Sequence, residues 1–424
     1  MWENEHKKAV IWNCVIGVVL VLVAAGLLYA VVQARKQIAA EDALLKEERT
    51  NQAQELSDAR QENQEAVRQE YEKDMETVQK YLPGIICWGD SLTAGSSGNV
   101  SYPLTLQKYI NTYLCDIYDL RFSIANPETY TRVNWGDYKF SIPVVNMGAG
   151  QEDAATILGR SGVVPYVVKT DFVIPEGVES VSIDIVSLDG RAVKPLTAGN
   201  AGVNPVTIAG VEGTITRISG PVMWGQTNYQ FTRLEPGEET PVTKGTEVLT
   251  ACRDEYTDYI HIVWLGTYGD YRTPEKLVSD IKALLERQTN NKDRYLVIGP
   301  CTTQGSWAMV NTTSLDAIDS AMLQAFGDRY INLRKYLIED GLRDAGLSAS
   351  GIMIKGNVPN SFRSNAGGAD MNGVAYQLVG KLIYGRMEQL GYFDEIRSEL
   401  NLDKITQELL KSDPTYFDRL LTSD

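Results

Sequence analysis

An uncharged apolar run near the N-terminus is the feature that most constrains this chain. The run covers Val15 to Val32 and extends back to Ala9. About 20 apolar residues in a helix span the roughly 30 Å hydrocarbon layer of a bilayer, whereas a cleaved signal peptide has a shorter apolar region and a small-residue cleavage site. We therefore expect a single-pass transmembrane helix over 9–33, preceded by a short head over 1–8. The short head favours a cell-membrane protein whose C-terminal part is extracytoplasmic.

Residues 34–82 change composition to Gln, Glu, Arg, Lys and Ala, without Gly or Pro. A thin apolar stripe runs along this segment at Ile38, Leu45, Leu56, Val67, Met75, Val78 and Leu82. The segment predicts a helical stalk of roughly 70 Å at 1.5 Å per residue. Two interpretations remain open, a solvated single-helix spacer and a coiled coil that makes a homo-oligomer. Pro83 and Gly84 end the stalk.

Composition excludes several classes of partner and chemistry. The chain carries 40 Lys and Arg against 55 Asp and Glu, a net charge of −15, which argues against nucleic acid as a partner. Its five cysteines are too few for a disulfide scaffold, and none has metal-ligand spacing. The two histidines are His6 and His261. A mechanism that needs a catalytic imidazole must use one of them.

A serine follows the first apolar segment after the stalk. Residues 85–88 predict a short buried strand, Gly89-Asp90-Ser91-Leu92 follows it, and a helix is expected over 102–114. A Ser at the end of a strand, before a turn and a helix, is where an α/β fold exposes a nucleophile at its carboxyl edge.

Strand and helix patterns alternate along the rest of this part of the chain. Further strands are expected at 144–147, 259–265 and 295–298, and helices at 153–158, 274–287 and 372–390. This alternation predicts a parallel sheet with helices on both faces.

At these residues the chain resembles the SGNH or GDSL-type hydrolase family, over about 84–162 and 251–393. The matching pieces are Gly89-Asp90-Ser91, Asn146-x-Gly148, the strand end at Gly266 and the C-terminal helix that ends in Leu390-Gly391-Tyr392. The resemblance implies a flavodoxin-like three-layer α/β/α domain, over 83–162 and 251–393, that hydrolyses esters such as acetyl groups on sugars or cell-wall polymers. It also implies no cofactor.

The resemblance assigns roles at the site. It makes Ser91 the nucleophile, with Asp90 in support. It also makes the N–H groups of Ser91 and Gly148 hydrogen-bond donors to the oxyanion. The family's third oxyanion donor is an Asn side chain, but Tyr268 stands at that position here. Loss of one such donor typically costs about 10²–10³ in rate.

The catalytic base of the family is missing from this sequence. Asp370 stands at the position of the family's His, and Gly367, or Asn365 with a two-residue insertion, stands at the position of its Asp. His6 precedes the membrane segment. His261 lies five residues before the strand end, roughly 16 Å away at 3.3 Å per residue, and we expect it to make a structural hydrogen bond.

Three functions follow from these observations. The first is a catalytically silent or impaired hydrolase-like protein used for binding or scaffolding at the cell surface, with a glycan or another surface ligand. The alternative is an active serine ester hydrolase, a deacylase of carbohydrate or cell-wall esters, that uses Ser91 with a rewired base. The third is a structural role in which the stalk oligomerises.

The family pattern is interrupted between the piece at Asn146-x-Gly148 and the strand that ends at Gly266. Residues 163–250 contain short β-prone segments separated by Gly and Pro turns, which predict an inserted small β-domain. We expect it to leave at the carboxyl edge of the sheet beside Ser91. Trp224 and Tyr229 either stack on sugar rings or fill the core of the insertion. The tail over 394–424 is expected to be helical.

Overall fold

The structure is a computed structural model of the chain. It describes residues 2–95, 100–112, 142–193, 201–217, 229–268, 273–290, 292–301, 312–348, 357–365 and 370–415. The chain forms two compact units. The first comprises Met1–Glu70 and Phe122–Val133, and the second comprises Tyr71–Arg121 and Asn134–Asp424.

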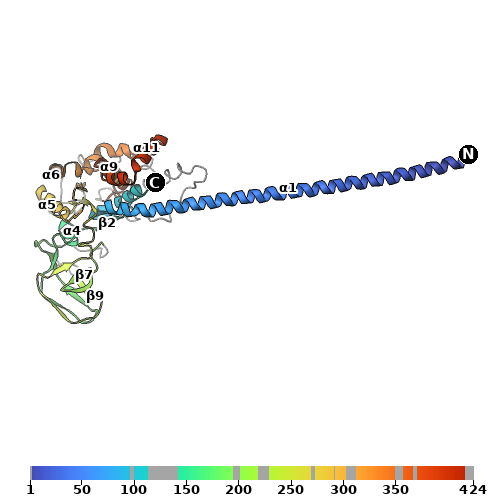
Figure 1. Ribbon diagram of the computed structural model, residues 1–424. Coiled ribbons are helices and arrows are strands. Elements are labelled where there is room, and N and C mark those ends of the chain that lie inside the picture. Colours follow the sequence, from blue (N-terminus) through green and yellow to red (C-terminus); the bar gives the residue numbers. More distant parts are fainter. Residues whose placement is uncertain are drawn as a thin grey trace. The chain divides into compact units, whose positions relative to one another are not determined.

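The expected head, membrane segment and stalk form one continuous helix, α1, over Trp2–Tyr81 (Figure 1). By length and composition α1 contains a segment apolar enough to cross a membrane. The helix continues because no Pro follows until Pro83 and no Gly lies between 34 and 83. Its last turns, from Tyr71, belong to the second unit, where Val78 is buried, as is Leu82 just beyond the helix.

The second unit is built on a five-stranded parallel sheet. Its strands are β1 (Ile85–Gly89), β2 (Val144–Gly148), β12 (Ile260–Trp264), β13 (Tyr295–Ile298) and β14 (Tyr330–Ile331). They lie in the order β14-β13-β12-β1-β2, and all neighbouring pairs are parallel. Strands β1 and β12 are buried along their whole length, as their mainly apolar sequences predict, although β12 contains His261. The sequence patterns identified every strand of this sheet except β14.

Helices cover both faces of the parallel sheet. The α-helices around this sheet include α2 (Ser91–Ala94), α4 (Ala154–Arg160), α5 (Pro274–Leu285), α6 (Thr312–Phe326), α7 (Leu333–Tyr336), α8 (Leu342–Asp344) and α9 (Gly373–Gln389). Helices α4, α5 and α6 share one apolar core with alternate residues of the strands, among them Ile86, Trp88 and Val263. On the other face, Tyr102 of the helical segment 102–112 packs against Trp264 with ring centroids 5.7 Å apart.

The inserted segment forms the predicted antiparallel β-structure. Seven strands lie in the order β5-β9-β8-β7-β11-β3-β6, and β10 pairs with β4. Their bounds are β3 (Tyr166–Val168), β4 (Phe172–Ile174), β5 (Ser180–Ile183), β6 (Ile185–Ser187), β7 (Val206–Ile208), β8 (Val211–Arg217), β9 (Tyr229–Arg233), β10 (Thr240–Val242) and β11 (Glu247–Leu249). Tyr229 is fully buried in the core of this sheet, so the second of its two alternatives, filling the core of the insertion, is confirmed and sugar stacking is not. Trp224 lies outside the described residues.

The insertion does not leave the parallel sheet where we expected. It begins after α4 and ends before the start of β12, so the carboxyl end of β2 leads into α4 and not into the insertion. The predicted exit beside Ser91 is therefore wrong. Polar contacts join the insertion to the helices of the sheet. The Arg191 guanidinium pairs with the buried Asp280 carboxylate of α5 at 2.8 Å, and the Thr250 hydroxyl donates to the Arg160 carbonyl of α4 at 2.6 Å.

The tail is helical, as predicted, over the part that the structure describes, which ends at residue 415. It forms α10 (Asp394–Glu399) and α11 (Leu402–Ser412) within the second unit. Both helices bury apolar side chains, so the described part of the tail packs as part of this unit. The buried residues are Ile396, Leu400, Leu402 and Leu409.

Candidate functional site

The sheet register brings the predicted site residues to one edge. Gly89, the last residue of β1, lies opposite Gly148 of β2 and Trp264 of β12. In parallel strands the residues that follow these positions emerge at the same edge. Ser91 begins α2 at this edge and is partly exposed.

Among the residues that the structure describes, the Ser91 hydroxyl meets a tyrosine and not a base. Its Oγ lies 3.4 Å from the Tyr268 Oη. Burial raises the pKa of the Tyr268 phenol above its ordinary value, and the charge of Asp370 adds to this effect. A phenol with a raised pKa stays protonated at neutral pH, so it can donate a hydrogen bond but cannot take the Ser91 proton.

The expected oxyanion donor Gly148 already has an acceptor. Its N–H donates to the Asn146 Oδ1 at 2.9 Å. A Cβ at Gly148 would lie 2.0 Å from the Ala94 nitrogen, so glycine lets the backbone of α2 pack directly on β2. The oxyanion role of Gly148 stays a prediction, and it requires the bond to Asn146 to open.

Asp90, which directly precedes Ser91 in the chain, is buried and caps helix α2. Its carboxylate accepts the Leu92 N–H at 2.9 Å and is the N-cap of α2. Burial raises the pKa of Asp90 to about 7, and hydrogen bonds from Leu92 and Thr267 partly offset this effect. The negative charge of Asp370 raises it further.

Asp370 lies near this edge without engaging Ser91. The negative charge of Asp370 raises the pKa of Asp90 and that of Tyr268. Asp370 itself is exposed. No hydrogen bond joins Ser91 to Asp370, both of which the structure describes. The position of Asp370 is fixed through its backbone, because its carbonyl accepts the Ser364 N–H at 3.0 Å.

Neither residue that could stand at the position of the family's Asp is able to act as a base. Asn365 is exposed, and its amide side chain does not titrate in the physiological range. Gly367 lies outside the described residues.

His261 lies away from Ser91, in the first half of β12. It is opposite Ile86 in the sheet, five residues before Ser91. Its ring Nε2 lies 3.1 Å from the Tyr256 carbonyl oxygen, and burial lowers its pKa to about 4. His261 is therefore a neutral structural histidine at physiological pH, which agrees with the sequence expectation.

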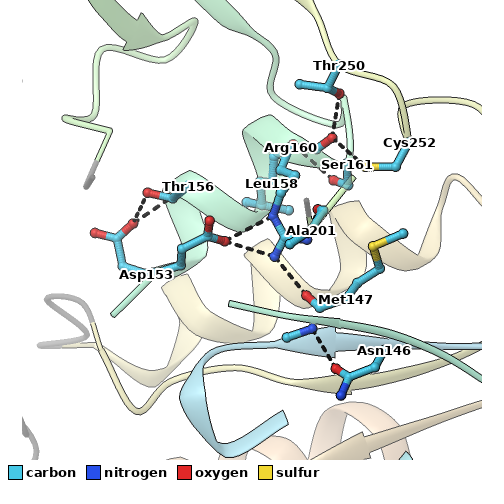
Figure 2. Close-up of polar contacts among 12 residues, drawn as sticks. Asn146, Met147, Asp153, Thr156, Leu158, Arg160, Ser161, Ala201, Thr250 and Cys252 are labelled. Carbon is cyan, nitrogen blue, oxygen red and sulfur yellow. Dashed lines mark hydrogen bonds and ion pairs between the residues drawn. The ribbon is translucent and has the colours of Figure 1, made fainter. Parts of the chain in front are cut away.

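The sequence analysis missed a buried ion pair beside this edge. Arg160 and Glu152 are both fully buried, and the Arg160 Nη2 lies 2.8 Å from the Glu152 Oε2. The Arg160 guanidinium also donates to the carbonyl oxygens of Met147 and Ala201, each at 2.8 Å (Figure 2). One side chain thus joins the end of β2, next to Gly148, to the insertion. The available signal was an Arg at the end of a helix without other charges, eight residues after a Glu that precedes its N-cap.

The described residues include no group of three His, Cys, Asp or Glu side chains that could hold a metal ion. Comparison with family models, curated proteins and solved structures finds no match to this chain. Function must therefore be inferred from the site itself.

Proposed function

We propose that this chain is a membrane-anchored protein that presents a catalytically silent or impaired domain of the SGNH or GDSL hydrolase type outside the cytoplasm. In this proposal the domain binds a glycan or another surface ligand, or serves as a scaffold. The apolar segment of α1 supports the anchor.

The sheet supports the proposed flavodoxin-like α/β/α fold. In chain order its strands lie as 2-1-3-4-5, which is the order of flavodoxin-like sheets. Helices lie on both faces, and Ser91 follows the first strand directly after Asp90. Ligands of such sheets bind outside the carboxyl ends of the strands, which is where Ser91 and Tyr268 meet.

The contact between Ser91 and Tyr268 is the main support for the proposal that the domain is catalytically silent or impaired. A serine hydroxyl needs a base to become a nucleophile, and a positioned base contributes typically about 10²–10⁴ in rate. Here the described partner of the hydroxyl is a phenol whose pKa is raised. The N–H of Gly148, the second expected group, is bonded within its own strand.

The alternative, an active serine ester hydrolase with a rewired base, has two observations in its favour. Ser91 is partly exposed at the start of α2, and Asp370 is near enough for its charge to act on Tyr268. A rotation of Tyr268 away from Ser91 is the rearrangement that this alternative requires.

Ester hydrolysis by the full-length chain in detergent micelles tests the proposal. p-Nitrophenyl acetate and acetylated glycans are the substrates, and Ser91→Ala is compared with Ser320→Ala, an exposed serine of α6. We expect wild type and both variants to show the same background rate. Turnover that is lost in Ser91→Ala and retained in Ser320→Ala contradicts silence and establishes the alternative.

Tyr268→Asn extends the same assay. It removes the phenol from Ser91 and places the family's amide donor at this position. We expect its rate to stay at background, because no base is added.

A binding assay with acetylated and unacetylated glycans tests the proposed ligand class on the same proteins. If neither kind of glycan binds, the result counts against a glycan ligand.

A further inference from the structure

A polar cleft of about 790 Å³ lies at the amino edge of the parallel sheet, opposite the edge that carries Ser91. The end of α1, the segments that precede β12 and β13, and the start of α10 form this cleft. All of them belong to the second unit. The five residues of β1 separate the two edges by roughly 16 Å. Binding sites for small ligands have volumes of about 300–1,000 Å³, so the cleft is large enough for one.

The charged side chains that line the cleft balance one another. Three are cations and three are anions, namely Lys80, Lys292, Arg294, Asp258, Asp293 and Glu395. Three carboxylates oppose a polyanion, and three cations oppose a polycation. An apolar ligand would remove all of these charges from water without giving them new partners. The lining therefore favours a ligand without net charge that is rich in hydrogen-bonding groups.

Hydrogen bonds fix the walls of the cleft. The Arg294 guanidinium donates to the Tyr81 carbonyl oxygen at 3.2 Å and pairs with the Glu395 carboxylate, so it joins the end of α1 to α10. The Thr289 N–H donates to the Thr257 carbonyl oxygen at 2.7 Å and joins the segments that precede β13 and β12. A cleft whose walls are already fixed loses little conformational entropy when a ligand binds.

The aromatic and polar groups of the cleft suit a saccharide. The Tyr81 ring is partly exposed, and the Lys80 ammonium lies 5.1 Å from its centroid. An aromatic ring is a flat apolar surface on which the C–H groups of a sugar ring can pack. Sugar hydroxyls both donate and accept hydrogen bonds. They can therefore bond to the Asn290 amide, the Asp293 carboxylate and the Lys292 ammonium, all of which are exposed.

We propose that this cleft is a second ligand site, which binds a neutral oligosaccharide. Such a ligand has no charge for the mixed lining to repel, and it uses both the aromatic ring and the hydrogen-bonding groups. A small zwitterion also has no net charge, but it makes no use of the flat ring. The site goes beyond the proposed function, because it includes no residue of the carboxyl edge.

Isothermal titration calorimetry of the full-length chain tests this site. The chain is held in micelles of a polyoxyethylene detergent, whose headgroup is neither charged nor a sugar. Maltohexaose and N-acetylchitohexaose are the saccharide probes, and phosphoethanolamine is the zwitterionic probe. We expect wild type to bind at least one of the two hexasaccharides and to bind phosphoethanolamine more weakly.

The double substitution Asn290→Ala with Asp293→Ala removes two exposed groups from the cleft. The Asp293 carbonyl oxygen still accepts the Arg329 Nε–H at 2.8 Å, so the loop keeps its place, as circular dichroism can check. We expect the hexasaccharide to bind this variant at least tenfold more weakly. Asn51→Ala with Asp42→Ala removes the same two kinds of group from an exposed part of α1 and should bind as wild type does.

Three results overturn the inference. They are a wild type that binds neither hexasaccharide, a cleft variant that binds as tightly as the α1 control, and a wild type that binds phosphoethanolamine more tightly than either hexasaccharide. Asn365→Ala with Asp370→Ala makes the same change at the carboxyl edge. If this edge variant alone weakens binding, the saccharide binds at the edge of the proposed function and the second site falls.

Discussion

The buried carboxyl of Asp90 should make the stability of the second unit fall as pH rises. Asp90 accepts the Leu92 N–H at 2.9 Å, and burial raises its pKa from 3.8 to about 7. The substitution Asp90→Asn keeps an oxygen that can accept this hydrogen bond and removes the charge. Wild type and variant therefore differ mainly in the cost of ionising a buried group.

The magnitude follows from the pKa of Asp90 in the two states. In the folded chain its pKa lies about 3 units above the unfolded value, and at about 1.36 kcal/mol per unit the full effect is about 4 kcal/mol. Because the folded pKa is the higher one, this stability is fully present below about pH 4 and is lost as pH rises through about 7. Relative to wild type, Asp90→Asn should therefore gain about 4 kcal/mol between these two pH values.

Urea unfolding of the full-length chain in detergent micelles measures this difference. Tryptophan fluorescence reports on the second unit, because Trp88 and Trp264 are buried in it. Asp153→Asn, at the partly exposed N-cap of α4, shows what an N-cap substitution costs by itself. A difference between Asp90→Asn and wild type that is flat between pH 4 and 7, or that favours wild type as pH rises, refutes the reasoning.

Three further predictions concern the same unit. Arg160→Met leaves Glu152 buried without its cation and should cost about 3–5 kcal/mol of unfolding free energy, whereas the double variant with Glu152→Leu should recover much of it, as a double-mutant cycle would show. His261→Gln should reduce the loss of stability below pH 6.5 by up to about 3 kcal/mol, because burial lowers the folded pKa of His261 to about 4; equal pH profiles for variant and wild type would contradict this. Gly148→Ala should disrupt folding because its Cβ meets the α2 backbone, whereas Gly385→Ala has open space and should be tolerated, as circular dichroism can check.

Strands bounded by strong breakers were predictable from the sequence. Residues 295–298 form an apolar run that ends at Gly299 and Pro300, and β13 has these same bounds. Asn372 was expected to begin the last long helix, and its side chain caps α9 by accepting the Ala375 N–H at 3.1 Å. In these cases local sequence and fold agree, so a single segment contains the necessary information.

Features that depend on distant segments were not predictable in the same way. Strand β14 is two residues long, Tyr330–Ile331, which is too short for any periodicity. The buried pair of Glu152 and Arg160 contradicts the usual rule that charge lies on the surface. The Ser91–Tyr268 contact joins residues 177 positions apart. The resemblance identified both positions, but only the register of β1 and β12 brings them together.

Two polar groups expected to act in catalysis at the carboxyl edge already have partners within the fold. Ser91 lies against Tyr268, and the Gly148 N–H is bonded to Asn146, so catalysis first requires both contacts to open. Each bond contributes only about 0.5–1.5 kcal/mol net, so opening them is not the main obstacle. If the undescribed residues supply no base either, the larger loss proposed for this domain is chemical, because a positioned base and one oxyanion donor correspond to about 10²–10⁴ and about 10²–10³ in rate. Binding by hydrogen bonds, which we propose for this edge, needs neither a base nor an oxyanion donor. The Arg160 guanidinium holds the end of β2 through its bond to the Met147 carbonyl oxygen.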